Sequence, residues 1–283
     1  MSSPSRPVTV LDQPAVLAGL FAVWRDLDAL VGELGDSQWQ TATSLPGWNV
    51  HDVIAHLIGV ESMLQGVDTP ETDIDVSTLD HVRNDIGVMN ERWVRKLRDL
   101  SAAELLETFR ATTAERRKAL SDLSNAQWND LTITPAGPDS YGRFMRVRIF
   151  DCWMHEHDIR DAIGAHARAS ELVGSAGDLA LDEMAASMGF VVGKLGGAPD
   201  GSRVSFELTG PLGRTINVAV EGRAKVVDDF GDDDPTSTIQ LDGLLFTRLA
   251  GGRTPLAQHV DAITYGGDEA VGRRVVEHLN YVI

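Results

Sequence analysis

The sequence predicts an α+β protein of two domains, an N-terminal antiparallel helix bundle followed by a small α+β domain. A chain of 283 residues is long enough for two domains. Apolar residues recur at helical spacing through the first 165 residues, whereas two segments after residue 200 alternate apolar and polar residues. We therefore expect a disordered leader at 1–9, a helix bundle at 10–165 and an α+β domain at 166–283.

The N-terminal part has several segments of helical periodicity with boundary residues at their ends. They lie at 11–34, 49–66, 78–99, 101–123 and 141–163. Asn49 and Ser101 are suited to cap the starts of two of them, while Gly35 and Gly164 are suited to end two others. Long helices with short connections favour an antiparallel bundle, whose interior can hold a site built from facing side chains.

The C-terminal part mixes helix and strand patterns. Residues 171–193 have the pattern of a helix, and 204–210 and 215–222 alternate as two strands of a hairpin around PLGR. We expect further strands within RAKVVDDF and TSTIQLDG, a short helix in LLFTRLAGGR and an amphipathic helix near the end. This mixture is typical of an α+β domain.

Charge and composition exclude several classes of function. A formal net charge of −17 opposes binding to nucleic acid or to an anionic membrane, because phosphate is repelled. The sequence has no apolar run of 18 residues that would span a bilayer. A single cysteine excludes an internal disulfide and fits a reducing cytosol, so we expect a cytoplasmic protein.

Three side chains form a candidate metal site. Asp151 and His155 lie four residues apart, so on a helix they stack on one face about one turn apart. His56 lies in another predicted helix between apolar neighbours, and its ring is expected to point inward. Two imidazoles and one carboxylate leave coordination positions open, which is typical of a catalytic divalent-metal centre rather than a closed structural one.

The same residues have a simpler interpretation. Carboxylate–histidine pairs four residues apart also occur as surface hydrogen-bonding partners, and a histidine on an apolar helix face is often a core residue with a satisfied ring. Spacing alone therefore leaves both interpretations open.

The wider pattern favours the metal site. The phrases LPGWNVHDVIAHL, HVRNDIG and RVRIFDCWMHEHDIRDAIG resemble the mycothiol-dependent maleylpyruvate isomerase family of DinB-like metal enzymes. LTGPLGRTINVAVEGRA and LLFTRLAGGR are similar to the sterol-carrier-like C-terminal domain of that family. The resemblance runs through nearly the whole chain from about residue 10, and its N-terminal motifs are the more specific.

This resemblance implies a ligand set. In the family, a histidine of a GW-x-x-x-D-x-x-x-H phrase and a Glu-x-x-x-His pair bind a divalent metal, usually zinc. These positions fall on His56, Asp151 and His155. The carboxylate here is Asp, one methylene shorter than Glu, so its helix would have to lie slightly nearer the ion.

The resemblance also implies a reaction. The cosubstrate would be mycothiol, the actinobacterial counterpart of glutathione, and an open divalent cation lowers a thiol pKa far below its free value of about 8.5. Addition of the thiolate to an activated double bond, then rotation and elimination, would make an isomerase; stopping at the adduct would make an S-transferase. The family uses a C-terminal arginine to bind its anionic substrate, which suggests Arg253 first and Arg223 second, although each also fits a structural ion pair.

The residues around the candidate ligands are expected to have supporting or structural roles. Asp52 could accept a hydrogen bond from the second ring nitrogen of His56, or serve only as an acid at a helix start. Asp158 is expected to tie its helix to neighbours. Cys152 is expected to be a packed, inert thiol and Trp48 a packing residue.

Two other classes of function remain open from the sequence. The C-terminal part could shelter an apolar or lipid-like ligand in a non-catalytic binding protein. Alternatively, the metal could activate water in a hydrolase. In every case the expected partners are small molecules, a thiol and a small electrophile in the preferred interpretation, and the chain is expected to be a monomer or homodimer.

Overall fold

The computed structural model describes residues 7–282 and divides into two compact units. The first ends at His166 and the second begins at Ala167. The first is helical and the second carries a mixed five-stranded sheet, which confirms the predicted α+β fold class. Within residues 7–282, no helix is long and apolar enough to cross a membrane.

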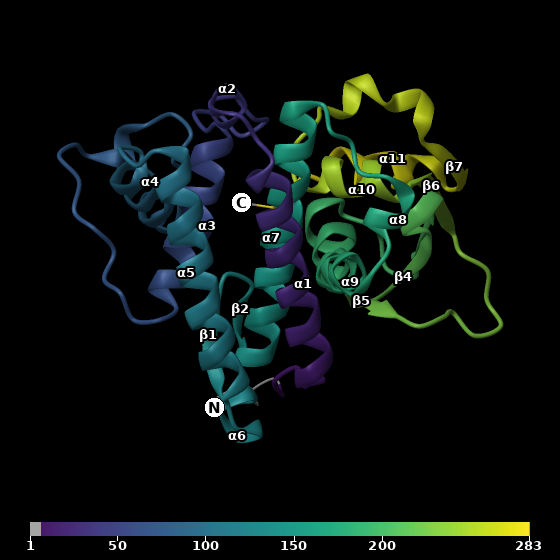
Figure 1. Ribbon diagram of the computed structural model, residues 1–283. Coiled ribbons are helices and arrows are strands. Elements are labelled where there is room, and N and C mark those ends of the chain that lie inside the picture. The colour runs from purple at the N-terminus through teal and green to yellow at the C-terminus, as the bar shows by residue number, and fades with distance from the viewer. Residues whose placement is uncertain (1–6, 283) are drawn as a thin grey trace. The chain divides into compact units, whose positions relative to one another are not determined.

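The first unit is built from four long helices with shorter elements between them (Figure 1). Its helices are α1 (Gln13–Gly32), α2 (Asp36–Trp39), α3 (Val50–Met63), α4 (Asp85–Leu97), α5 (Ala102–Ser121), α6 (Asn125–Trp128) and α7 (Tyr141–Ile163), with a 3-10 turn η1 at Val76–Thr78. Asn49 caps α3 and Ser101 caps α5, as the sequence predicts. Gly164 ends α7 in a left-handed conformation (φ 70°), which glycine adopts without steric cost.

Helices α3 and α5 run in the same direction. His51 near the start of α3 hydrogen-bonds the carbonyl of Leu100, just before α5. Further along both helices, Glu61 of α3 accepts from Arg116 of α5. The sequence does not reveal this parallel pair, because the long connection through η1 and α4 is what returns the chain to the start of the bundle.

Helices α3 and α7 run in opposite directions. His56 lies beside Asp151, whereas the later residue Glu61 accepts a hydrogen bond from the earlier Arg148. This antiparallel crossing places the side chains of one helix opposite those of the other along their length. The candidate metal ligands come from this crossing.

A β-hairpin interrupts the helices before α7. Strands β1 (Leu131–Thr134) and β2 (Gly137–Ser140) pair antiparallel between the predicted helices at 101–123 and 141–163. Thr9 donates its backbone N–H and its hydroxyl to Asp139 at the end of this hairpin. The predicted leader at 1–9 therefore has an ordered end at Thr9, and residues 1–6 lie outside the described part of the chain.

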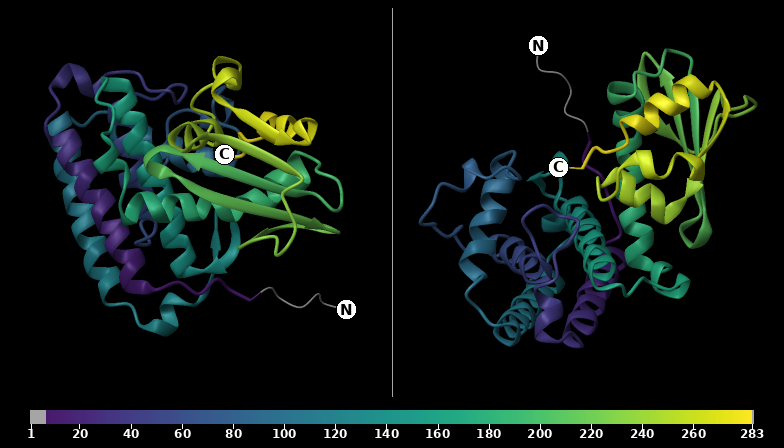
Figure 2. Two further views of the ribbon diagram at one scale, coloured as in Figure 1. Left: turned by 90° about the vertical axis from the view of Figure 1, so that its right-hand side faces the viewer. Right: turned by 90° about the horizontal axis from the view of Figure 1, so that it is seen from above.

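The second unit packs helices against a mixed sheet of order β5-β4-β3-β6-β7 (Figures 1 and 2). Only β3 and β6 pair in parallel. The strands are β3 (Arg203–Thr209), β4 (Arg214–Glu221), β5 (Arg223–Val227), β6 (Ser237–Asp242) and β7 (Thr264–Gly267). The helical segments are α8 (Ala169–Leu172), α9 (Ser175–Phe190), η2 (Val191–Leu195), η3 (Gly210–Leu212), α10 (Gly243–Ala250), η4 (Leu256–Gln258), η5 (Val260–Ala262) and α11 (Glu269–Glu277).

One face of this sheet is apolar and covered. Phe206 pairs with Ile216 on one side and Ile239 on the other, and the pair Val204–Val218 follows in the same register. All five side chains are buried. The alternation that predicted β3 and β4 therefore marks the face that meets the helices.

The structure also differs from the prediction in the bounds of two helices and in one strand that was not predicted. The helix expected at 78–99 begins at Asp85, because Asn84 caps it by accepting from the Gly87 N–H. The helix expected at 171–193 is divided between α8, α9 and η2. Strand β7 was not predicted, since its short sequence TYGG contains two glycines and no apolar alternation.

Candidate metal centre

The three predicted ligands converge between α3 and α7. His56 comes from the middle of α3, and Asp151 and His155 come from successive turns of α7. One potential ligand atom from each of the three lies within 4.8 Å of the others. The imidazoles are buried, while the Asp151 side chain is 28% exposed.

The spacing of these atoms suits a small divalent ion. Asp151 Oδ2 lies 3.3 Å from His56 Nε2, and Asp151 Oδ1 lies 3.5 Å from His155 Nε2. These two distances involve different oxygens of the carboxylate, and ligand atoms 2.0–2.1 Å from a tetrahedral zinc ion are about 3.3 Å apart. The shorter aspartate therefore does not hold its carboxylate away from the two rings. The donor set of two imidazoles and one carboxylate fits a divalent transition metal with open positions.

Asp158 orients one of the two imidazoles. Its Oδ2 lies 3.0 Å from His155 Nδ1, which leaves Nε2 of this ring facing Asp151. A carboxylate on the far nitrogen of a ligand histidine fixes the tautomer and increases the donor strength of the near one. The sequence offered Asp52 as one possible partner of the other imidazole, His56, and gave Asp158 only the role of tying its helix to neighbours, although its position three residues after His155 was a usable signal.

The contacts of Asp52 decide between its two interpretations. Its carboxylate accepts from Arg98 at 2.8 and 3.0 Å and from the Asn49 N–H at 3.1 Å, so it ties the start of α3 to Arg98. Among residues 7–282, Nδ1 of His56 has no hydrogen-bond partner. The helix-start alternative for Asp52 is the one that its contacts support.

The two imidazoles differ in their electrostatic surroundings. Burial lowers the pKa of His56 by more than Asp151 raises it, which keeps the ring in the neutral form that binds metal. Burial also lowers the pKa of His155, but the carboxylates of Asp151 and Asp158 outweigh it and the pKa of His155 is raised. A metal ion bound by the three side chains would replace a proton on His155, because the raised pKa favours the protonated ring.

Asp151 stays ionised because Arg148 and the two imidazoles lie beside it. Burial raises its pKa, but Arg148 and the two imidazoles hold the pKa of Asp151 well below its ordinary value. Nη1 of Arg148 donates to Asp151 Oδ2 at 2.5 Å. The sequence does not single out Arg148, because an arginine one turn before an acid is a common helix pair.

Trp48 covers the imidazoles from the loop before α3. Its ring centroid lies 5.2 Å from that of His56 and 6.5 Å from that of His155. The indole N–H donates to the buried carboxylate of Glu91 at 3.0 Å, and the His81 ring lies 3.1 Å from the same oxygen. Trp48 is thus held in place as a wall of the site.

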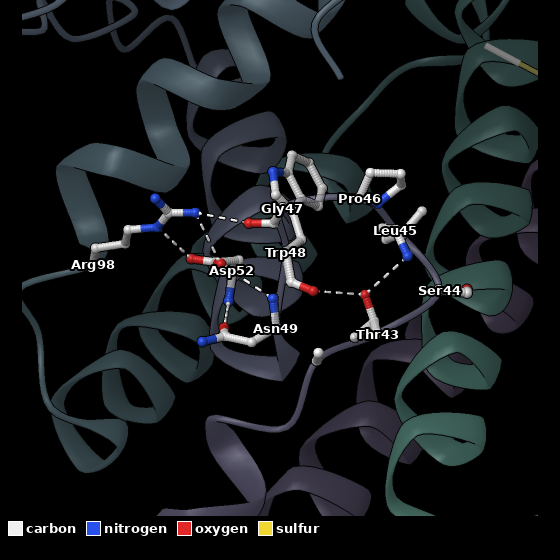
Figure 3. Close-up of a pocket in the computed structure, with 10 residues that line it drawn as sticks. Thr43, Ser44, Leu45, Pro46, Gly47, Trp48, Asn49, Asp52 and Arg98 are labelled. Carbon is white, nitrogen blue, oxygen red and sulfur yellow. Dashed lines mark hydrogen bonds and ion pairs between the residues drawn. The ribbon is translucent and has the colours of Figure 1, made fainter. Parts of the chain in front are cut away.

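A cavity of about 410 Å³ lies on the other side of this loop. It is lined by residues 42–49 together with Asp52 and Arg98, and Figure 3 shows Arg98 bridging Asp52 and the carbonyl of Gly47. Trp48 contacts the two imidazoles and also lines this cavity. The lining contains none of the three candidate ligands, so the cavity adjoins the metal centre rather than containing it.

Two further predictions concern single side chains. Cys152 is buried, and burial raises the pKa of its thiol, which agrees with the expected inert packing role. Arg253 lies in the second unit, where its Nη1 donates to the carbonyl of Gly251 at 2.6 Å. Its expected role in substrate binding stays a prediction.

Comparison with known families identifies both units. Residues 20–160 match the mycothiol maleylpyruvate isomerase N-terminal domain, and residues 178–274 match the C-terminal domain of the same family. The chain belongs to the mycothiol maleylpyruvate isomerase family. This membership confirms the resemblance seen in the sequence motifs.

Solved structures and curated proteins are similar to this chain over most of its length. The crystal structures of mycothiol-dependent maleylpyruvate isomerase and of a mutant of it superpose with TM-scores of 0.58 and 0.56. They are 18% and 17% identical and cover 90% of this chain and 93% of theirs, which shows a shared fold. Two uncharacterized proteins of Mycobacterium tuberculosis, one from each of two strains, are 27% identical over 78% of this chain and 83% of theirs.

Proposed function

We propose that this family member is a divalent-metal-dependent enzyme that uses a low-molecular-weight thiol to isomerise a small electrophilic substrate or to transfer the thiol to it. The observation that carries the proposal is the convergence of His56, Asp151 and His155 between two helices. Two imidazoles and a carboxylate with open positions occur in catalytic zinc centres, so zinc is the first metal to test. The fold shared with mycothiol-dependent maleylpyruvate isomerase makes mycothiol the first thiol to test.

When bound at this group, a divalent cation would lower the pKa of a thiol and make it nucleophilic at neutral pH. The side chains of the protein have supporting roles. His56, Asp151 and His155 would hold the ion, Asp158 keeps Nε2 of His155 directed at it, and Trp48 shields one side from water. The partial exposure of Asp151 leaves an entry for the thiol.

Arg253 is the proposed group for an anionic substrate. The family resemblance supports this assignment, and the guanidinium could bind a carboxylate in a bidentate manner. A substrate screen must determine which electrophile reacts and whether the product is an isomer or a thiol adduct.

The first test is metal content. We expect the purified protein to hold about one divalent ion per chain by elemental analysis and the His56→Ala variant to hold little, because two ligands with open positions bind zinc far more weakly than three. His51→Ala is a matched control, since His51 is a buried histidine of the same helix that bonds the Leu100 carbonyl instead. Equal, negligible metal in the native protein and His56→Ala would overturn the proposal.

Turnover assays then separate the possible reactions. The metal-loaded protein is titrated with mycothiol by calorimetry and screened with small electrophiles, including maleylpyruvate, in the presence and absence of the thiol. Thiol-dependent turnover supports the proposal. Ester or amide hydrolysis without thiol would instead identify a hydrolase, and a retained lipid-like ligand without turnover would identify a binding protein.

A further inference from the structure

A buried arginine links the candidate metal centre to a second carboxylate. Nε of Arg148 donates to Glu61 Oε1 at 2.8 Å, and its Nη1 donates to Asp151 Oδ2 at 2.5 Å. The side chains of Arg148 and Glu61 are 4% and 1% exposed. A guanidinium shared between two carboxylates in such a place is held strongly, because leaving either acid unpaired there is costly.

A second buried arginine, Arg116, also pairs with Glu61 but does not bond Asp151. Arg116 donates to the other oxygen of Glu61 at 2.9 Å and is buried to the same degree. Its Nη2 turns to the hydroxyl of Tyr141 at 3.2 Å and not to Asp151. Glu61 thus has two cationic partners, and one of them, Arg148, also reaches a candidate metal ligand.

The contact with Arg148 limits what Asp151 can offer to an ion. Oδ2, the oxygen nearest His56, already accepts a charge-assisted hydrogen bond. An ion that bound Oδ2 would share this oxygen with the guanidinium. An ion that bound Oδ1 would have only that oxygen of Asp151 unshared with Arg148. In both cases a fixed positive charge stands behind the carboxylate and opposes the arriving cation.

We infer that Arg148 is the resident counter-cation of Asp151 and competes with the metal ion for this carboxylate, so that it sets the metal affinity of the centre. Arg148 is a positioning residue in this role, because it acts through Asp151. The inference rests on the proposed metal-dependent function and deepens it. A carboxylate shared with a guanidinium donates less charge to an ion, which leaves the ion more able to acidify a thiol.

The test compares Arg148→Met with Arg116→Met. Each variant removes one buried guanidinium from Glu61, so each should lower the melting temperature of the metal-free protein measured with a chelator present. Zinc affinity is measured by competition with a chromophoric chelator. We expect Arg148→Met to bind zinc at least about tenfold more tightly than the native protein, and Arg116→Met to stay within about threefold.

The opposite directions of the two readouts distinguish this role from a structural one. A residue that only supports the fold would lose zinc affinity together with stability when removed. Arg148→Lys keeps the positive charge and should restore native zinc affinity to within about threefold. If Arg148→Met does not fold without metal, Glu61→Gln/Arg148→Met removes one charge of each sign and should show the same tightening.

The outcomes separate this inference from the proposed function. If the native protein binds zinc and Arg148→Met binds it equally or more weakly, the inference is overturned and the proposed function stands. If only Arg148→Met binds zinc, the inference is supported and the native metal enzyme is contradicted. Failure of both proteins to bind zinc would overturn both.

Discussion

The ring nitrogen that faces away from the metal centre determines how well each histidine can serve as a ligand. His155 has Asp158 on its Nδ1 at 3.0 Å, whereas Nδ1 of His56 has no such partner in residues 7–282. The two imidazoles are therefore not equivalent. Donor strength and orientation are better defined at His155, and both depend on a residue outside the ligand set.

Removing this carboxylate should weaken the centre without removing a ligand. We expect Asp158→Asn to weaken zinc binding about 10- to 100-fold, because His155 loses the charge that orients and polarises it. The same chelator competition measures the effect. Asp161→Asn, which changes an exposed acid of the same helix, is the control, and equal affinities in the two variants would contradict this assignment.

At the scale of elements, the start of α7 is fastened to the segment before α1. Asp139 accepts the backbone N–H and hydroxyl of Thr9 at 2.6 and 2.9 Å and pairs with Arg143 at 2.9 Å. Ser140 caps α7 and donates its hydroxyl to the Thr9 carbonyl. These bonds join the β-hairpin, α7 and the chain before α1, so they position the helix that carries two of the candidate ligands.

This fastening should depend on pH in a defined range. Burial raises the pKa of Asp139, but its bonds to Arg143, Thr9 and Ser140 outweigh burial and lower the pKa from 3.8 to about 2. A lowered pKa means that the stabilisation is complete above about pH 5 and is lost as the pH falls through 4 to about 2 and below. The contribution is about 2 kcal/mol.

The measurement is the free energy of unfolding of the native protein and Asp139→Asn as a function of pH. The native protein should be more stable by about this amount at pH 5, and the difference should shrink steadily between pH 4 and pH 2. A difference that stays constant over this range would show that ionisation of Asp139 is not its source.

For the whole molecule, the candidate metal centre belongs entirely to the first unit. Its three candidate ligands join α3 to α7 across 95 residues of sequence, so an ion there would fasten two helices of the bundle together. An ion that binds only the folded state at 100 times its dissociation constant adds about 2.7 kcal/mol to stability. The overall charge of −17 favours accumulation of cations around the chain.

Hydrogen exchange can locate this stabilisation. We expect zinc to slow amide exchange in peptides from α3 and α7, relative to the chelated protein, and to leave peptides from β3, β4 and β6 unchanged. The His56→Ala variant should show no zinc-dependent protection. Equal protection of both units, or of neither, would contradict a metal centre confined to the first unit.

Local patterns in the sequence determined the fold class, most helices, the strands with alternating residues, and the candidate pair Asp151 and His155. Helix caps, strand alternation and the four-residue spacing of Asp151 and His155 act over one or two turns, so the sequence displays them directly. Family phrases supplied the link to His56, which spacing alone could not give.

Only the tertiary structure decided which charges surround these ligands and how the long helices are oriented. Glu61 meets Arg116 and Arg148 across 55 and 87 residues, and the sequence contains no local signal for either pairing. Asp52 pairs with Arg98 because the parallel course of α3 and α5 brings the start of α3 close to the residues just before α5. Buried charges must be paired, and the partner of each is chosen by which helices lie next to one another.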